Sequence, residues 1–414
     1  MYYPSMVVIS KPRGTRDFGP HDMLQRRHVE IMMRTTFQRY GFQEIATPTF
    51  EHLELFTTKS GEGIVDETYA FTDKSGRELA LRPELTAPVI RFYIEHMQME
   101  PKPLKLFYFA NCFRYDRPQA GRYREFWQMG CELIGTDYPE AIAELISLAY
   151  YVLREAGLED ITLRVGDLSL CRSILDDLGI SNHTAILRLI DKGDLEAVAE
   201  ALADQSGADD FLAFLQCRDS ASLEDYLPLE HTQAIRDVME WLSVLDTPAE
   251  LDTAIARGLD YYSGIVFEID APALGAEKQL CGGGQYSLVS LLGGAKTPTA
   301  GFALGFDRIL LALEKEGSEV VKPHDLIYVT PVGEDMRRHA ARLVHSLQMK
   351  GIPAEMDIMQ RSVTKSLQHG NRIGARYALI VGSDEWERDA VTVKNMKTGE
   401  QQEVPVEGID AFIL

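Results

Sequence analysis

Four arginines lie within one short stretch of an otherwise acidic chain. The stretch spans residues 113–135, and the whole 414-residue chain carries a formal net charge of -21. The planar guanidinium group of arginine matches the oxygens of a phosphate, which it binds through two parallel hydrogen bonds. An apolar run that contains Gln128 and Glu132 follows directly. The pattern therefore predicts a phosphate-binding site beside a strand with polar residues on one face. For any single arginine the alternative is a surface salt bridge. The four are Arg114, Arg117, Arg122 and Arg124.

Two strands, Leu106–Tyr115 and Glu125–Ile134, are expected on either side of this loop. Successive side chains of a strand point to opposite faces of its sheet. The small residues Ala110 and Gly130 are expected to leave space above one face. A half-exposed sheet with an ordinary polar outer face is the alternative, and the alternation leaves both interpretations open. The face in question would carry Arg114, Gln128 and Glu132.

The elements around these strands are expected from periodicity and from turn residues. A helix is expected over residues 28–40, before Gly41, and a hairpin turn at Lys74-Ser75-Gly76. Thr86 should open another helix. Residues 140–157 should be helical, and about 167–250 should form a helical insertion. After a polar linker, the order strand–helix–strand–helix–strand indicates a separate small α/β domain. The chain has no G-x-x-x-x-G-K-[ST] loop, and no G-x-G-x-x-G motif follows a predicted strand.

Composition restricts the class of protein. The five cysteines are odd in number and include no C-x-x-C pair, so neither a disulfide framework nor a zinc site is expected. The expected location is a reducing cytoplasm. No apolar run reaches the length of a membrane span. The acidic balance argues against loose coating of nucleic acid, but local basic patches could still hold a nucleic-acid partner.

Several segments resemble the motifs of histidyl-tRNA synthetases, a class II aminoacyl-tRNA synthetase family, in the same order along the chain. The resemblance implies an α/β (α+β) fold: a class II catalytic domain on an antiparallel sheet at 1–320, with the helical insertion, and a C-terminal α/β anticodon-binding domain at 324–414. It also implies a homodimer, because Pro48 stands where motif 1 ends. The segments are GTRDF, LRPELTAP, FRYDRPQAGRYREFWQMGCELIG, ARGLDYYSGIVFEI and GFALGFDRI.

The resemblance further implies that L-histidine is activated with ATP, with Mg²⁺ expected, and is then transferred to tRNA(His). No metal site built from protein side chains alone is expected. Thr86 could instead serve as a helix cap, and Tyr261 could simply be packing. Histidine would be bound by Glu84, Leu85, Thr86, Gln128, Glu132, Tyr261, Tyr262 and Tyr286. ATP would be bound by Arg114, Arg122, Arg257 and Arg308, with Arg114 and Arg257 as the catalytic pair at the α-phosphate. The tRNA acceptor end would contact Arg117 and Gln119.

One segment departs from the family pattern. Gln285 and Ser287 stand where the family usually has arginine and aspartate, which puts the support around Tyr286 in doubt. Three other interpretations of the chain compete with this one. A regulatory subunit of ATP phosphoribosyltransferase shares the fold but usually lacks the C-terminal domain. A different synthetase of the same subgroup conflicts with the RGLDYY signature, and a plain scaffold leaves the ordered motifs unexplained.

Overall fold

The computed structural model describes residues 9–60, 62–117, 121–256, 262–318 and 326–413. The chain divides into two compact units, Met1–Val320 and Val321–Leu414. Each unit has its own sheet and its own hydrophobic core.

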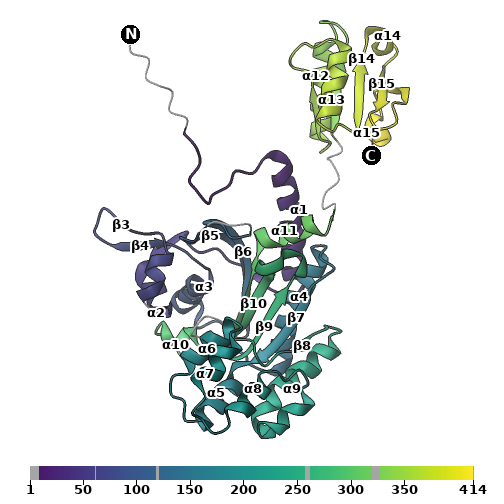
Figure 1. Ribbon diagram of the computed structural model, residues 1–414. Helices are drawn as coiled ribbons and strands as arrows, with labels where there is room; N and C mark the ends of the chain where they lie inside the picture. Colours follow the sequence, from purple (N-terminus) through teal and green to yellow (C-terminus); the bar gives the residue numbers. More distant parts are fainter. Residues whose placement is uncertain (1–8, 61, 118–120, 257–261, 319–325, 414) are drawn as a thin grey trace. The chain divides into compact units, whose positions relative to one another are not determined.

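The first unit is built on an eight-stranded sheet in the order β1-β5-β6-β11-β10-β9-β7-β8 (Figure 1). Only the outer pairs β1–β5 and β7–β8 are parallel, so the predicted antiparallel sheet is confirmed. The predicted loop joins two long central strands, which are paired along their whole length. The strands are β1 (Gln43–Glu44), β5 (Leu104–Phe113), β6 (Glu125–Ile134), β7 (Thr162–Asp167), β8 (Glu250–Leu251), β9 (Tyr262–Asp270), β10 (Gln279–Tyr286) and β11 (Thr299–Gly305).

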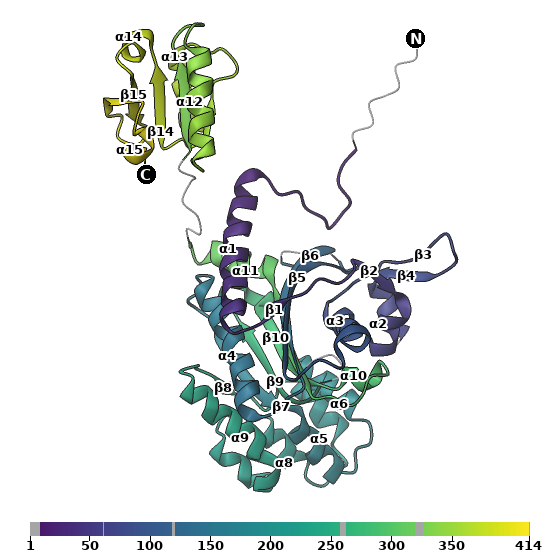
Figure 2. The same cartoon turned by 180° about the vertical axis from the view of Figure 1, so that it is seen from behind.

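One face of this sheet is apolar and is covered by helices α1, α4 and α11 (Figures 1 and 2). Phe107 of β5 stacks on Phe37 of α1, with ring centroids 5.2 Å apart. Helix α1 begins at Pro20, which needs no amide partner there, and the Asp22 carboxylate accepts a hydrogen bond from the Gly19 N–H at 2.9 Å. The helices are α1 (Pro20–Arg39), α4 (Pro139–Glu155) and α11 (Phe306–Lys315).

The opposite face carries the polar residues of β5 and β6, and helices α2 and α3 lie on that side (Figure 2). A small sheet, β2-β4-β3, adjoins them. Its β3–β4 turn is the predicted one, since the Asp73 carboxylate accepts hydrogen bonds from the N–H groups of Ser75 and Arg77. The elements are β2 (Phe50–His52), α2 (Leu53–Ser60), η1 (Glu62–Glu67), β3 (Ala70–Thr72), β4 (Glu78–Leu81), α3 (Thr86–Phe92) and η2 (Tyr93–Met97).

Between β7 and β8 the chain is helical, as its helix-forming composition predicts. Asp167, Asn182 and Asp194 each accept a hydrogen bond from a backbone N–H in the first turn of the helix that follows, which fixes where three of these helices begin. The helices are α5 (Leu168–Asp177), α6 (His183–Asp191), α7 (Leu195–Ala201), α8 (Ala208–Phe214), η3 (Ala221–Asp225) and α9 (Leu229–Val244); η4 (Pro272–Glu277) and α10 (Leu288–Leu291) follow β9 and β10.

The second unit has the predicted alternation of strands and helices. Its sheet has the order β13-β12-β14-β15-β16; the first three strands are parallel and the last two pair antiparallel. Among the described residues, no helix of the chain is long and apolar enough to span a membrane. The elements are β12 (Ile327–Pro331), α12 (Arg337–Met349), β13 (Ala354–Met356), α13 (Val363–Arg372), β14 (Tyr377–Val381), α14 (Ser383–Trp386), β15 (Ala390–Asn395), β16 (Gln401–Pro405) and α15 (Ile409–Ile413).

Candidate active site

A cavity of about 350 Å³ lies on the polar face of the large sheet. Residues of β6, β9, β10 and β11 line it together with Phe56 of α2 and Thr86 of α3. This volume falls in the range of small-molecule sites. The predicted polar face of β5 and β6 is therefore part of a ligand-sized cavity and is not an ordinary outer face.

Most of the predicted site residues meet in this cavity. Leu85 and Glu132 are fully buried and do not line it. Arg117 is exposed and does not line it either. Arg257, Tyr261 and Gln119 lie outside the described residues. The predicted residues that do line the cavity are Glu84, Thr86, Arg114, Arg122, Gln128, Tyr262, Tyr286 and Arg308.

Three arginines gather at one end of the cavity, which makes it the more cationic end. Arg308 is held there by the carbonyl oxygens of Gln279 and Gly121, at 2.9 and 3.2 Å, and by the Glu277 carboxylate at 2.5 Å. Burial lowers the pKa of Arg308, and the charges of Arg122 and Arg114 lower it further, against the opposing effect of Glu277. Like charges collected in a partly buried cavity favour an anionic ligand, because an anion relieves their repulsion.

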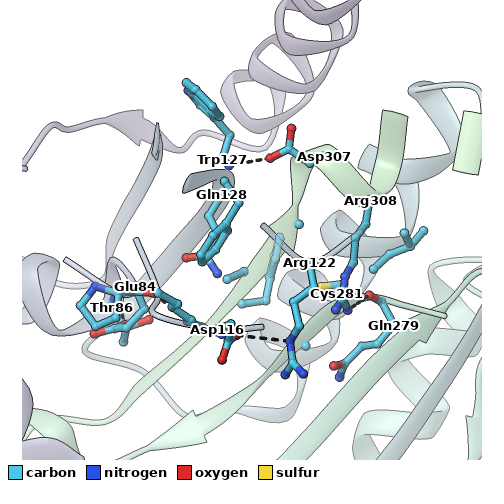
Figure 3. A pocket seen from close by; sticks show the side chains of 18 of the residues that line it. Glu84, Thr86, Asp116, Arg122, Trp127, Gln128, Gln279, Cys281, Asp307 and Arg308 are labelled. Atoms are coloured by element: carbon cyan, nitrogen blue, oxygen red, sulfur yellow. Dashed lines mark hydrogen bonds and ion pairs between the residues drawn. The ribbon is translucent and has the colours of Figure 1, made fainter. Parts of the chain in front are cut away.

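Two further arginines complete this end. Arg114 donates from Nε to the carbonyl oxygen of Pro83 at 3.0 Å, which fixes the side chain at the end of β5. Arg122 pairs with Asp116 at 3.3 Å and stays half-exposed. In Figure 3, Arg122 and Arg308 lie on the side of the cavity away from Glu84 and Thr86. The cavity thus has a cationic end and a separate end around the Glu84 carboxylate.

The Glu84 end begins at the first turn of α3. The Glu84 carboxylate accepts hydrogen bonds from the N–H groups of Thr86, at 2.7 Å, and Ala87, at 3.1 Å. As predicted, Thr86 is the first residue of α3. The alternative role as its cap is not seen, because Leu85 holds the cap position and the Glu84 side chain satisfies the amides. Each carboxylate oxygen has a second lone pair, so Glu84 can still accept a hydrogen bond from a ligand cation.

Glu132 lies beneath the cavity between two tyrosine hydroxyl groups. The Tyr286 hydroxyl donates to Glu132 Oε2 at 2.5 Å, and the Tyr108 hydroxyl donates to Oε1 at 3.3 Å. Burial and the charge of Glu132 hold the pKa of Tyr108 well above its usual value, so Tyr108 remains a donor. The carboxylate lies across Gly301, where any Cβ atom would overlap it, and Gly301 itself lines the cavity. Glycine at this position brings the charge close to the cavity floor.

The space expected above Gly130 is not open. The Tyr108 hydroxyl fills it, at 2.6 Å from the position that a Cβ atom would take. Gln128 lies further along the same face, and its Oε1 accepts a hydrogen bond from the Cys112 thiol at 3.4 Å. Burial raises the pKa of this thiol to about 12, so it stays protonated and orients the Gln128 amide.

Asp307 is a cavity residue that the sequence did not single out. Its carboxylate pairs with Arg26 at 2.6 Å and Arg16 at 2.7 Å, and accepts a hydrogen bond from the Trp127 N–H at 2.8 Å (Figure 3). This one side chain therefore ties α1 and the segment before it to β6 and to the first turn of α11. Its position next to Arg308 was the only sequence signal.

Groups of three His, Cys, Asp or Glu that could hold a metal ion are not found among the described residues. The carboxylate of Asp116 lines the cavity beside Arg122, and that of Glu67 also lines the cavity. Mg²⁺ usually keeps water ligands and is held by one or two carboxylates together with substrate phosphates. The residues present therefore fit a magnesium ion that arrives with a nucleotide better than one that resides in the protein.

Comparisons with known proteins agree along the whole chain. Residues 14–309 match the family model described as "Histidyl-tRNA synthetase", and residues 326–414 match "Anticodon binding domain". The histidine--tRNA ligase of Methanospirillum hungatei is 47% identical over 403 residues, which cover 96% of this chain and 97% of that protein. The histidine--tRNA ligase of Archaeoglobus fulgidus is 44% identical over 98% of this chain and 100% of its own. The crystal structure of apo S. aureus histidyl-tRNA synthetase superposes with a TM-score of 0.76 at 30% identity, covering 98% of this chain and 100% of that one.

Proposed function

The chain belongs to the histidyl-tRNA synthetase family, and we propose that its two-ended cavity is where histidine and ATP react. The chain is a histidine–tRNA ligase that uses ATP, and its C-terminal unit belongs to the anticodon-binding domains. A regulatory subunit of ATP phosphoribosyltransferase has less support, because the family model and the full-length relatives are ligases. What supports the proposed site is a cation cluster at one end of a single cavity and a Glu84–Gln128–Tyr286 end opposite.

The chemistry follows from this division. A carboxylate oxygen of histidine attacks the α-phosphorus of ATP, the new P–O bond forms as the bond to pyrophosphate breaks, and histidyl-adenylate results. Arg114 is hydrogen-bonded to Pro83, the residue directly before Glu84, and is therefore assigned the α-phosphate. Arg122 and Arg308 are assigned the leaving pyrophosphate. Fixed cations in a cavity act by positioning the reactants and by stabilising developing charge.

Histidine binds at the other end in this proposal. Glu84 accepts from the α-ammonium group, with Thr86 and Gln128 beside it. The imidazole lies against Tyr262 and Tyr286, and Tyr286, whose hydroxyl donates to the buried Glu132, recognises a ring nitrogen with the carboxylate charge behind it. A neutral imidazole has one donor and one acceptor, so a carboxylate and a hydroxyl can select it over apolar rings. In the second step the terminal ribose hydroxyl of the tRNA attacks the adenylate carbonyl, and AMP leaves.

Four assignments rest on the resemblance and stay predictions. Arg257 is assigned the α-phosphate with Arg114, and Tyr261 the histidine end. Arg117 and Gln119 are assigned the acceptor end of the tRNA. Arg117 is exposed and does not line the cavity. Mg²⁺ is proposed to bind together with ATP. The protein is proposed to act in the cytoplasm, whose reducing conditions suit its five buried cysteines, none of them in a disulfide.

The experiment that tests this function is ATP–pyrophosphate exchange with each amino acid in turn, followed by aminoacylation of tRNA(His). Exchange that depends on histidine alone is expected. Exchange supported equally by another amino acid, or absent with all of them, contradicts the proposal.

A chain shortened after Gly317 should keep pyrophosphate exchange within about twofold but raise the KM for tRNA at least tenfold. The reason is that every residue lining the cavity belongs to the first unit, which has its own core, whereas anticodon contacts would be lost. Parallel measurement of exchange and aminoacylation checks this. An equal fall in both rates would contradict the assignment of the C-terminal unit to the anticodon.

The protein should be a homodimer in solution, with twice the 46.5 kDa chain mass by light scattering at micromolar concentration. The small sheet β2-β4-β3, whose first strand follows Pro48, supports this. Phe50 and Phe71 are 53% and 44% exposed in the single chain, with ring centroids 6.5 Å apart. Exposed neighbouring rings mark interaction surfaces. The mass of a single chain would contradict the proposal.

A further inference from the structure

Strands β9 and β10 do not pair evenly beside the histidine end of the cavity. Gly284 pairs with Val266, whereas Tyr286 pairs with Tyr262. One residue of β10, Gln285, therefore stands opposite three residues of β9. A bulge of this kind leaves backbone groups without ladder partners and redirects the neighbouring side chains.

Gln285 supplies a partner that the bulge requires. Its side-chain Oε1 accepts a hydrogen bond from the Ile265 N–H at 2.9 Å. The same oxygen lies 2.5 Å from where a Cβ atom of Gly264 would be, so the close approach depends on glycine. Gln285 is only partly buried, and its side chain lies on the bulge, whereas Tyr286 next to it is directed at Glu132.

The bulge is flanked by both tyrosines of the cavity. Tyr262 and Tyr286 form the residue pair that closes one end of it, and Gly284 and Val266 form the pair at the other end. The two tyrosine rings meet edge to face with centroids 6.4 Å apart. Both line the cavity, and the Tyr286 hydroxyl bonds to Glu132 at 2.5 Å. The geometry of the bulge therefore sets where the two rings stand relative to that carboxylate.

We propose that Gln285 is a positioning residue for histidine: by accepting the Ile265 N–H it fixes the bulge, and through the bulge the rings of Tyr262 and Tyr286. This inference rests on the proposed function of the cavity. What the position needs is a hydrogen-bond acceptor. Arginine has five donors and no acceptor, so an arginine at this position could not make this bond. Gln285 is then a different solution to the support of Tyr286, not a defect.

The test separates the acceptor from size and charge. Gln285→Met has similar length but only a weakly accepting sulfur in place of the oxygen, Gln285→Arg is polar but has no acceptor, and Gln285→Glu keeps the acceptor oxygen. Ser287→Ala is the matched control, because Ser287 is exposed and its side chain makes no capping bond at α10. Kinetic constants for histidine and for ATP are measured by pyrophosphate exchange. In parallel, hydrogen–deuterium exchange is followed in a peptide that contains Ile265.

Gln285→Met and Gln285→Arg should each raise the KM for histidine about five- to tenfold, the effect of one hydrogen bond, with the KM for ATP unchanged. Gln285→Glu and Ser287→Ala should stay within about twofold of the parent. Protection of the Ile265 amide should fall in the first two variants only. If Gln285→Met does not fold, Gln285→Arg decides the matter, since a long polar side chain suits a partly exposed position.

Unchanged kinetics in both variants that lack the acceptor oxygen would overturn the proposal, as would equal rises in both KM values or a Gln285→Glu variant as impaired as Gln285→Met. The amide exchange does not depend on activity. A parent protein without histidine-dependent pyrophosphate exchange would therefore refute the proposed function, whereas unchanged Ile265 protection in Gln285→Met would refute the role of Gln285 in the bulge.

Discussion

Replacing Arg308 by glutamine should slow histidine-dependent ATP–pyrophosphate exchange by a hundredfold or more, with the KM for histidine within about twofold of the parent. Negative charge moves onto pyrophosphate as the bond to the α-phosphorus breaks. Arg308 is held in place before the reaction by Gln279, Gly121 and Glu277, so it stabilises that charge without reorganisation. Loss of one such fixed donor costs about 3–4 kcal/mol of transition-state stabilisation, which is roughly 10²–10³ in rate.

A basic residue of the same helix provides the control. Lys315 lies near the end of α11, and its Nζ donates to the carbonyl oxygen of Ala273 at 3.0 Å; it does not line the cavity. Lys315→Gln should exchange pyrophosphate at the parent rate. Both variants should melt within a few degrees of the parent, because Arg308 already sits among like charges. Near-normal exchange in Arg308→Gln, or a collapsed melting temperature with no separate kinetic effect, would contradict a role at the phosphates.

The framework of this site follows from local sequence rules. The strict alternation in β5 and β6 predicts which side chains share a face, and Phe107 packing on α1 opposite Gln128 in the cavity agrees with it. Glycine and polar turn residues predict the β3–β4 hairpin, and the order of elements predicts the second α/β unit. These features depend on residues that are near one another in the chain.

The contacts that finish the site depend on distant segments instead. Asp307 meets Arg26, which is 281 residues away, and Tyr286 meets Glu132, which is 154 residues away. Periodicity carries no information on such pairs. It also missed that Tyr108, from the neighbouring strand, would fill the space above Gly130. At Gln285, the family pattern suggested weaker support around Tyr286. The sequence alone could not show the bulge in which the Ile265 N–H needs a hydrogen-bond acceptor.

Replacing Glu132 by glutamine should raise the KM for histidine roughly 30- to 150-fold, with the KM for ATP within about twofold. The substitution keeps the size of the side chain but removes its charge. Glutamine offers one acceptor oxygen in place of two, so it cannot accept from both Tyr286 and Tyr108, and the bond that remains is no longer charge-assisted. A hydrogen bond to a charged, buried group contributes about 2–3 kcal/mol, the equivalent of that range. Pyrophosphate exchange at varied histidine and varied ATP measures the two constants separately.

Tyr108→Phe distinguishes histidine recognition from support of the sheet. Tyr108 also donates to Glu132, at 3.3 Å, but it is buried above Gly130 and does not line the cavity. Its loss should lower the melting temperature by a few degrees and leave the KM for histidine nearly unchanged, whereas Tyr286→Phe should raise that KM. If Glu132→Gln and Tyr108→Phe instead behave alike, with both KM values and the melting temperature shifted together, then Glu132 holds the sheet and the imidazole is recognised elsewhere. A change confined to the histidine constant in Glu132→Gln and Tyr286→Phe would place recognition at this buried carboxylate, with Tyr286 as the group between it and the ligand.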